Sequence, residues 1–399
     1  NFSLNNLTEA DSSLQKLCVI QPNNVGVWYD RGLTLTKLKR NYDAIHCYQK
    51  TLELRPDYND AFWNMALLYQ KEGKLIELIE VYENYQHNKE HGYIFHSFLA
   101  QAYHLLGEGN KAIKLIDVAI SLHPHNNTKD KHFLNFLLIK GNIFNSLSKP
   151  DEAIKTYEEV IKIDDSVEQA FVNIGSALIN SERMKEAIPY LEKAKILNPK
   201  YSVTYINLGN AYYSLGDKDK ALKYFEKAEE LDPGVSAALS SKAVAYMDSG
   251  KKDQAIVHLI KAIERDPYNG NAYINIAVFF REQGALEEAE KWLKRGITIL
   301  KSQPYKEKQI AKSLTNLGYT YLDLEKYDKM KECFVEAIKY NDEHIGVAGF
   351  YCYSKLFVAD WKDLDTYKNL TLKKVEEKKN VCTPFRSFSI TDDPKIQYD

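Results

Sequence analysis

The chain has 399 residues, of which 27% are charged, and its 53 basic and 55 acidic residues leave a formal net charge of −2. Charges this balanced and interleaved give no electrostatic footprint for nucleic acid or for an anionic membrane surface. No apolar run approaches the roughly 20 residues of a membrane span, and the first residues lack the basic and apolar regions of a signal peptide. We therefore expect a soluble protein that binds neither nucleic acid nor membranes.

The five cysteines indicate a reducing compartment. They are widely separated and form no C-x-x-C pair, so they match neither a disulfide framework nor a zinc site. We expect a cytoplasmic or nuclear protein, two locations that cysteine usage does not separate.

A unit of 34 residues recurs along most of the chain, and its clearest copy is residues 202–235. In this copy two amphipathic helical patterns of about a dozen residues are joined by a turn at Gly216, and Pro233 closes the unit as a helix stop. Neither helix can bury its apolar face alone, so the hairpin needs neighbours.

Small residues mark this period. Gly209 and Ala221, at positions 8 and 20 of the unit, are expected where the two helices approach closely, so a larger side chain there would overpack by about 1–3 kcal/mol. The spacing at position 8 is 34 residues except for two steps of 41, which indicate two seven-residue insertions. The residues at position 8 are Gly32, Ala66, Ala100, Gly141, Gly175, Gly209, Ala243, Ala277 and Gly318.

A 34-residue period with small residues at positions 8 and 20, an aromatic at position 11 and a closing proline resembles the tetratricopeptide repeat, over roughly residues 1–344. The resemblance implies an all-α fold, a right-handed superhelical solenoid of about ten helical hairpins. We divide the chain into a partial repeat at 1–24, the repeat array at 25–344, capping helices at 345–380, and a connector or the start of a further domain at 381–399.

The insertions fall near 125–132 and 301–309. The first could be two extra helical turns or a loop, and its Asn, Thr and Asp content favours a loop. The second contains Pro304, which we expect to end one helix before the next repeat begins. The repeat that begins at Asn59 should be irregular, because Leu78 replaces its second small residue and no proline closes it.

The resemblance also implies that the first helix of each hairpin lines the inner face of the solenoid and carries recognition. Asn is a mediocre helix former, so its recurrence at position 6 of this face needs a cause beyond stability. A carboxamide offers both the donor and the acceptor that an extended peptide backbone requires, so we predict a ladder that binds peptide backbone. The alternative is that these side chains only bridge adjacent first helices. They are Asn64, Asn173, Asn207, Asn275 and Asn316.

Neighbouring inward positions add further candidate peptide-binding residues, with acids that could select basic or hydroxyl-bearing side chains of a partner. They are Asn210, Tyr213, Asp248, Tyr319 and Asp323.

Cations occupy position 7, which is normally apolar, in three repeats. We expect Arg31, Lys140 and Lys242 to extend their stems over apolar surface beside a neighbouring acid, and direct contact with a partner is the alternative.

Nothing in the sequence predicts catalysis, a cofactor or a metal site. There is no Gly-rich phosphate loop and no nucleophile elbow. His87 and His91, four residues apart, and His123 and His125 have no cysteine or carboxylate cluster beside them, so we assign them no metal.

After residue 359 the period is lost, and the elements that follow are Asp360-Trp361, Pro384-Phe385, Asp392-Asp393-Pro394 and Gln397. Their order resembles the connector between repeats and catalytic domain in the SPINDLY-like O-linked N-acetylglucosamine transferases. In that family the superhelix receives protein substrates, an asparagine ladder grips the peptide backbone, and a downstream domain transfers the sugar.

That second resemblance implies that the chain is the substrate-recognition arm of such a transferase, inert by itself. The ladder of the family maps by repeat position onto Asn173, Asn207, Asn275 and Asn316, and less securely onto Asn64. A start in mid-repeat and an end at the first turn of a helix lead us to expect a longer polypeptide. The alternative is a stand-alone adaptor or scaffold for the assembly of a protein complex. Both alternatives have protein or extended peptide as the partner, and neither indicates an oligomeric state.

Overall fold

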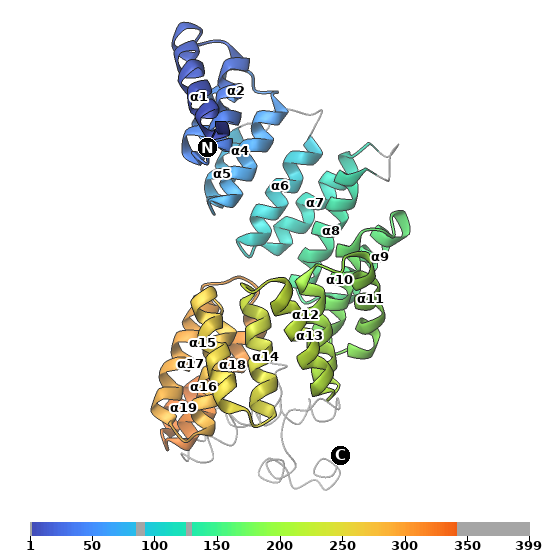
Figure 1. Ribbon diagram of the computed structural model, residues 1–399, viewed down its shortest axis with the longest axis vertical. Helices are drawn as coiled ribbons and strands as arrows, with labels where there is room; N and C mark the ends of the chain where they lie inside the picture. The colour runs from blue at the N-terminus through green and yellow to red at the C-terminus, as the bar shows by residue number, and fades with distance from the viewer. Residues whose placement is uncertain (1, 85–91, 125–129, 341–399) are drawn as a thin grey trace. The chain divides into compact units, whose positions relative to one another are not determined.

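The structure, a computed structural model, describes residues 2–84, 92–124 and 130–340, and over these ranges it contains nineteen α-helices and no strand (Figure 1). The predicted all-α fold is confirmed. The capping helices predicted at 345–380, the connector at 381–399, and His87, His91 and His125 lie outside the described residues. The chain divides into two compact units, Asn1–Asn173 and Ile174–Asp399, with the boundary inside one helix.

The helices of the first unit are α1 (Phe2–Ile20), α2 (Val25–Lys37), α3 (Asn41–Leu54), α4 (Asn59–Lys71), α5 (Leu75–Asn84), α6 (Gly92–Leu105), α7 (Gly109–Leu122), α8 (Lys131–Ser146) and α9 (Pro150–Ile163), and the boundary helix is α10 (Glu168–Asn180). The helices of the second unit are α11 (Met184–Leu197), α12 (Ser202–Ser214), α13 (Lys218–Leu231), α14 (Ser236–Asp248), α15 (Lys252–Arg265), α16 (Gly270–Glu282), α17 (Leu286–Lys301), α18 (Glu307–Asp323) and α19 (Tyr327–Tyr340).

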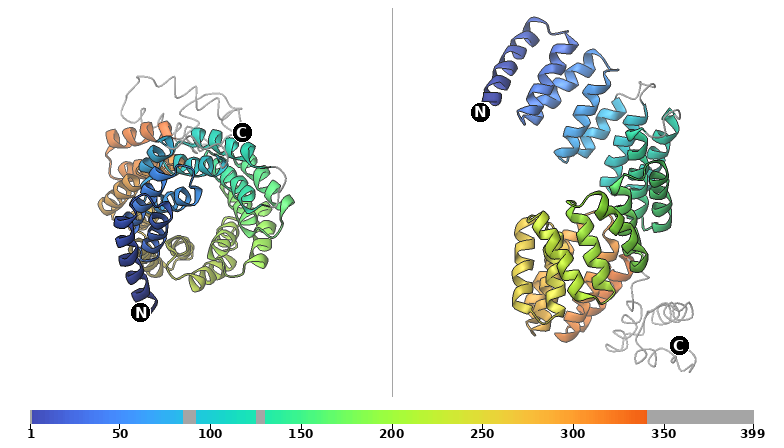
Figure 2. Two further views of the ribbon diagram at one scale, coloured as in Figure 1. Left: turned by 90° about the horizontal axis from the view of Figure 1, so that it is seen from above. Right: turned by 45° about the vertical axis from the view of Figure 1, so that its right-hand side comes forward.

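Consecutive helices form antiparallel hairpins, such as α2 with α3 and α12 with α13, and each hairpin packs on the next within its unit (Figure 2). We call the even-numbered helices from α2 to α18 the first helices and the odd-numbered helices from α3 to α19 the second helices. First helices also contact the next first helix, as α12 does α14 and α14 does α16. Each helix therefore buries its apolar face against neighbours that are mostly one repeat away in sequence.

The turn inside each hairpin uses one residue in the left-handed backbone region. This residue is position 15 of the repeat, with φ between 57° and 87° in all nine hairpins. The sequence signals the turn only in the five repeats where that residue is glycine. In the other four repeats the residue has a side chain, and the left-handed backbone conformation costs about 1–2 kcal/mol of stability there. The nine residues are Lys39, Gly73, Gly107, Ser148, Glu182, Gly216, Gly250, Gly284 and Glu325.

The close approach predicted at Gly209 is present. A Cβ added there would lie 2.6 Å from Cδ1 of Phe225, and nearer still to Cε1, although real Cβ atoms essentially never come within 3.0 Å. The residue that limits the space is therefore Phe225 on α13, and Ala221 is fully buried on the same helix. Gly141 and Tyr157 form an equivalent pair in the first unit.

The described end of the first insertion is helical, which agrees with the alternative of added helical turns, and residues 125–129 lie outside the described residues. α8 begins at Lys131 and has 16 residues, whereas the regular first helix α12 has 13, so three residues of the insertion extend the helix. Asp130 caps this added turn, because its side chain accepts a hydrogen bond from the backbone N–H of His132 at 3.2 Å.

The second insertion is almost entirely helical. α17 continues to Lys301 with 16 residues, against 14 in α13, and α18 has 17, against 13 in α12. Pro304 does lie between the two helices, as predicted, but only one of the seven inserted residues lengthens the connection. Gln309 lies in the extra turn of α18. From the 34-residue period alone, this helix would be expected to start only at Ala311.

In the repeat that begins at Asn59, α5 is described from Leu75 to Asn84, where the first described range ends. Leu78, which replaces a small residue of the other regular repeats, is buried at 1% exposure.

Glu290 ties α17 to α18 and α19 in the second unit. It accepts hydrogen bonds from Lys294 Nζ at 2.7 Å, Tyr321 Oη at 3.0 Å and Lys326 Nζ at 3.0 Å. Burial alone would raise the pKa of Glu290, but these hydrogen bonds outweigh it and lower the pKa to about 2.

Candidate peptide-binding groove

The first helices α12, α14, α16 and α18 of the second unit, labelled in Figure 1, line a cavity of about 740 Å³, which we call the asparagine groove. It brings together five residues that the sequence predicted to bind peptide: Asn210, Tyr213, Asp248, Asn275 and Asn316. Asn207, Tyr319 and Asp323 belong to the same unit but do not line the groove, and Asn64 and Asn173 belong to the first unit.

Three carboxamides in the groove are available to a ligand. Asn210, Asn275 and Asn316 are half-buried, and their side chains make no hydrogen bond with any described residue. Because each carboxamide has two donors and an acceptor, the groove presents several unused hydrogen-bonding groups on adjacent helices.

The corresponding carboxamides of the first unit each donate a hydrogen bond to the preceding first helix. Asn64 Nδ2 donates to the Tyr29 hydroxyl at 3.2 Å, and Asn173 Nδ2 donates to Asn142 Oδ1 at 3.0 Å. The same Asn142 oxygen accepts a hydrogen bond from the Tyr157 hydroxyl at 2.6 Å. These two asparagines therefore bridge adjacent first helices, which is the alternative that the sequence left open.

The acids at position 13 are paired with groups of a preceding repeat. Asp248 accepts a hydrogen bond from the Tyr213 hydroxyl at 2.5 Å and lies 3.6 Å from Lys218 Nζ. Burial, together with this hydrogen bond and the carboxylate charge, raises the pKa of Tyr213. The Tyr213 hydroxyl is therefore protonated and oriented, and Asp248 is not an unpaired acid that could select a basic partner side chain.

Asp323 is held in the same way. Arg281 Nε donates to Asp323 Oδ2 at 2.8 Å, and the Arg281 guanidinium lies 5.4 Å from the ring centroid of Tyr319. Arg281 of α16 and Tyr319 and Asp323 of α18 therefore form one cluster, and none of the three lines the groove.

The groove also contains residues that the sequence did not single out. Its apolar lining includes four residues at positions 5 and 9 of their repeats, which we call the floor: Ile206, Val244, Ile274 and Val278. Ile206 and Ile274 are also core residues, only 6% and 7% exposed. Its polar lining includes Ser240, Asn271, Gln309 and Lys312. Asn271 and Lys312 occupy position 2 of their repeats, so the repeat register could have identified them as groove residues. Gln309 could not be found in this way, because it is part of the inserted turn of α18.

The three cations at position 7 are paired with acids, as predicted. Lys140 Nζ lies 2.8 Å from Asp117, and Lys242 Nζ lies 2.8 Å from Glu229. In each pair the acid belongs to the preceding helix, so the pair joins neighbouring hairpins.

Arg31 is part of a larger cluster. Asp11, a buried residue of α1, accepts hydrogen bonds from Arg31 Nε at 2.9 Å and from Arg40 Nη1 at 2.7 Å. The cluster therefore fastens α1 to the first complete hairpin.

Within residues 2–84, 92–124 and 130–340, no group of three His, Cys, Asp or Glu side chains could hold a metal ion. His123 is buried and its Nε2 lies 2.8 Å from Asp130 Oδ2. No helix in the described part of the chain combines the length and the apolar character needed to cross a membrane.

Family models of the tetratricopeptide repeat match residues 25–58, 134–166, 168–201, 202–235, 246–304 and 311–344, together more than half of the chain. The chain belongs to the tetratricopeptide-repeat proteins, whose solenoids are typical of protein-binding scaffolds.

One curated relative is the tetratricopeptide repeat-containing protein trd-1 of Caenorhabditis elegans, 27% identical over 118 residues. The match covers 26% of this chain and spans only 15% of the relative's length.

Among solved structures, the crystal structure of the APC/C hetero-tetramer Cut9-Hcn1 is similar with a TM-score of 0.55 and 14% identity, covering 97% of this chain and 79% of that one. This similarity concerns the helical-repeat fold alone. The crystal structure of MamA is 27% identical and covers 42% of this chain and 95% of that one, with a TM-score of 0.35.

Proposed function

We propose that the chain is a protein-binding scaffold that holds an extended segment of a partner in the asparagine groove. The observation that carries this proposal is the set of unused carboxamides of Asn210, Asn275 and Asn316 above an apolar floor. An extended segment exposes one donor and one acceptor per residue on its backbone, which carboxamides can match whatever the side chains are.

The apolar floor adds selectivity for side chains. Alternate side chains of an extended segment point to the same side, so every second residue would face Ile206, Val244, Ile274 and Val278. Lys312, which forms no ion pair with a described residue, offers a cation at the α18 end of the groove. We therefore expect a preference for segments with alternating apolar residues and an acidic residue at one end.

The energies set the expected affinity. Each carboxamide-to-backbone hydrogen bond contributes about 0.5–1.5 kcal/mol net, so three contribute about 1.5–4.5 kcal/mol before the segment's ordering is subtracted. Burial of apolar side chains supplies the rest at about 25 cal/mol per Å². We therefore expect a transient complex, with an affinity in the range typical of peptide recognition.

The test is a matched pair of variants. Peptides selected on the chain from a random library are titrated calorimetrically against a groove variant, with Asn210, Asn275 and Asn316 replaced by Ala, and a control variant, with Asn64 and Asn173 replaced by Ala. We expect affinity to fall by about tenfold to a thousandfold in the groove variant and to change little in the control. Unchanged affinity in the groove variant would reject the proposed role of these carboxamides.

A second readout separates backbone from side-chain recognition. N-methylation of single peptide bonds removes one backbone donor at a time while leaving the side chains in place. Under the proposal, methylation near the peptide's centre weakens binding to the native chain and has a smaller effect on the groove variant.

We also propose, from the tail resemblance alone, that the groove presents protein substrates to a glycosyltransferase domain. The residues that carry that resemblance, from Asp360 to Gln397, lie outside the described residues. Sequencing the polypeptide of the source organism beyond Asp399 tests it: a nucleotide-sugar-binding domain there supports the transferase, and its absence leaves the adaptor. A cytoplasmic or nuclear location remains a proposal, supported by the free, buried thiols of Cys18, Cys47 and Cys333.

A further inference from the structure

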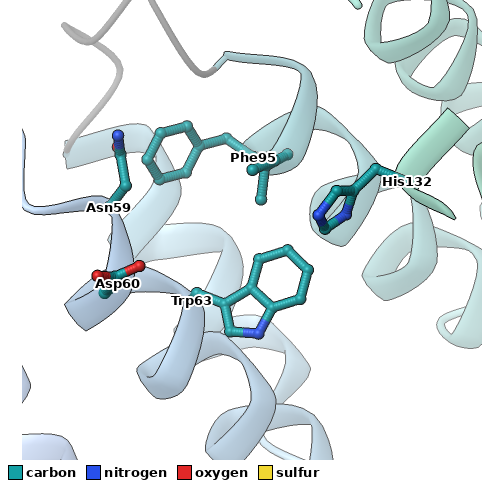
Figure 3. A pocket seen from close by; sticks show the side chains of 6 residues that line it. Asn59, Asp60, Trp63, Phe95 and His132 are labelled. Carbon is teal, nitrogen blue, oxygen red and sulfur yellow. The ribbon is translucent and has the colours of Figure 1, made fainter. Parts of the chain in front are cut away.

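The first unit has a second cavity, unrelated to the asparagine groove. It has a volume of about 260 Å³ and lies between α4, α6 and the start of α8 (Figure 3). We call it the Trp63 pocket, and its lining residues are Asn59, Asp60, Trp63, Ile94, Phe95 and His132. The volume is below the roughly 300–1,000 Å³ of sites for drug-sized molecules and suits a single long side chain.

Three of the six lining residues, Trp63, Phe95 and His132, have aromatic rings. The Trp63 ring meets the His132 ring at a centroid distance of 5.6 Å and the Phe98 ring at 4.8 Å, both nearly perpendicular. Figure 3 shows Trp63 on one side of the opening, Phe95 opposite it, and His132 facing Asp60 across the space between them. The contacts with Phe98 and His132 hold the indole in place before any ligand arrives.

The first insertion creates part of this pocket. His132 belongs to the added turn of α8, and its backbone N–H is fixed by the cap that Asp130 provides. A repeat of regular length would begin this helix about one turn later and would not bring an imidazole to Trp63. The pocket is therefore specific to this repeat.

The polar lining of the pocket consists of Asp60, Asn59 and His132, and its acidic group has no ionic partner within the described ranges. Asp60 is exposed and makes neither an ion pair nor a hydrogen bond with any described residue. Asn59 Oδ1 is buried and has no hydrogen-bond partner in the described part of the chain. A carboxylate without an ionic partner beside aromatic faces complements a cationic donor, whereas the buried Asn59 oxygen is out of a ligand's reach.

We propose that the Trp63 pocket binds an arginine side chain of a partner protein. The planar guanidinium would stack on Trp63 and donate hydrogen bonds to the exposed carboxylate of Asp60. Arginine suits this site better than lysine, because its guanidinium is more weakly hydrated, stacks on aromatic rings and has five donors in a fixed plane. The pocket is independent of the asparagine groove, so either site can fail without the other.

The experiment uses the full chain and a short Gly-Ser peptide that contains one arginine. Binding is followed by the NMR signal of the Trp63 indole N–H, which a Trp63→Phe variant assigns. The comparison peptides carry citrulline, which has nearly the same shape without the charge, or norleucine. We expect the arginine peptide to shift the Trp63 signal, to leave the Trp28 and Trp292 signals unmoved, and to bind about tenfold more tightly than the citrulline peptide.

Two acid variants complete the test. Asp60→Asn should remove most of the preference for arginine over citrulline, whereas Asp57→Asn, an exposed acid of the same unit outside the pocket, should leave it unchanged. Equal binding of arginine and norleucine peptides would show an apolar pocket and overturn the proposal. Absence of a Trp63 shift with every peptide would also overturn it.

Discussion

Replacement of Gly209 by alanine should loosen the hairpin of α12 and α13. The new Cβ would lie 2.6 Å from Cδ1 and 2.9 Å from Cζ of Phe225, whose side chain is only 1% exposed. Overpacking of this kind costs about 1–3 kcal/mol, and the better helix propensity of alanine returns about 0.5–1 kcal/mol. We expect a net loss of about 1–2 kcal/mol in local stability.

Other repeats of the chain indicate which second substitution should compensate for Gly209→Ala. Position 24 lies opposite position 8, and it holds an aromatic ring in four of the five repeats with glycine at position 8, namely at Gly209, Gly32, Gly141 and Gly318, whereas Gly175 faces Leu191. Where position 8 is alanine, position 24 is Ile or Leu in three repeats, with Tyr82 in the repeat that begins at Asn59 as the exception. Those three aliphatic residues are Ile116, Leu259 and Leu293.

Phe225→Leu in the Gly209→Ala background should therefore restore most of the loss. Phe225→Leu alone leaves a cavity and should cost about 1–2 kcal/mol, whereas the double variant reproduces the Ala243 and Leu259 pair that the next hairpin already uses. A double-mutant cycle should then give a favourable coupling of about 2 kcal/mol.

Amide hydrogen exchange of α12 and α13 is the suitable assay, because solenoid stability is largely a sum of local terms and a chain of this size does not unfold in two states. Helices α18 and α19 serve as the internal control. Unchanged protection in the Gly209→Ala variant, or a double variant no more stable than the two single losses predict together, would refute the reasoning.

Two further predictions concern charge. The folded pKa of Glu290, about 2, lies below its ordinary value of 4.5, so its contribution to stability is present above pH 4.5 and is lost as the pH falls toward 2. The loss should approach about 3 kcal/mol, and Glu290→Gln should remove this part of the acid dependence of α17 to α19 in a urea titration. An identical acid profile in that variant would count against the assignment. Asp11→Ala should leave Arg31 without its partner and cost about 2–4 kcal/mol, seen as lost exchange protection of α1 with the second unit unaffected. Retained protection of α1 would mean that apolar packing alone holds that helix.

Much of the fold follows from local pattern. The 34-residue period, the small residues at position 8 and the helix-stop prolines predicted where the hairpins begin, and helices do begin at Val25, Asn59, Glu168, Ser202 and Ser236. The insertions were harder to predict. Asn, Thr and Asp favour loops on average, but a capping aspartate and the neighbouring packing surface let inserted residues extend α8. Similarly, α17 is two residues longer and α18 four residues longer than the regular helices α13 and α12.

The sequence by itself determined the helices, their pairing and the presence of asparagine on the first helices, because each of these depends on residues within one repeat. Only the tertiary structure decided which carboxamides are used. Asn64 and Asn173 find partners 35 and 31 residues away, whereas Asn210, Asn275 and Asn316 find none among the described residues. These distances are close to one repeat, so the outcome depends on which side chain the neighbouring hairpin presents when the two stack. The Trp63 pocket has the same origin, since an inserted turn of α8 meets a tryptophan two repeats earlier in the chain.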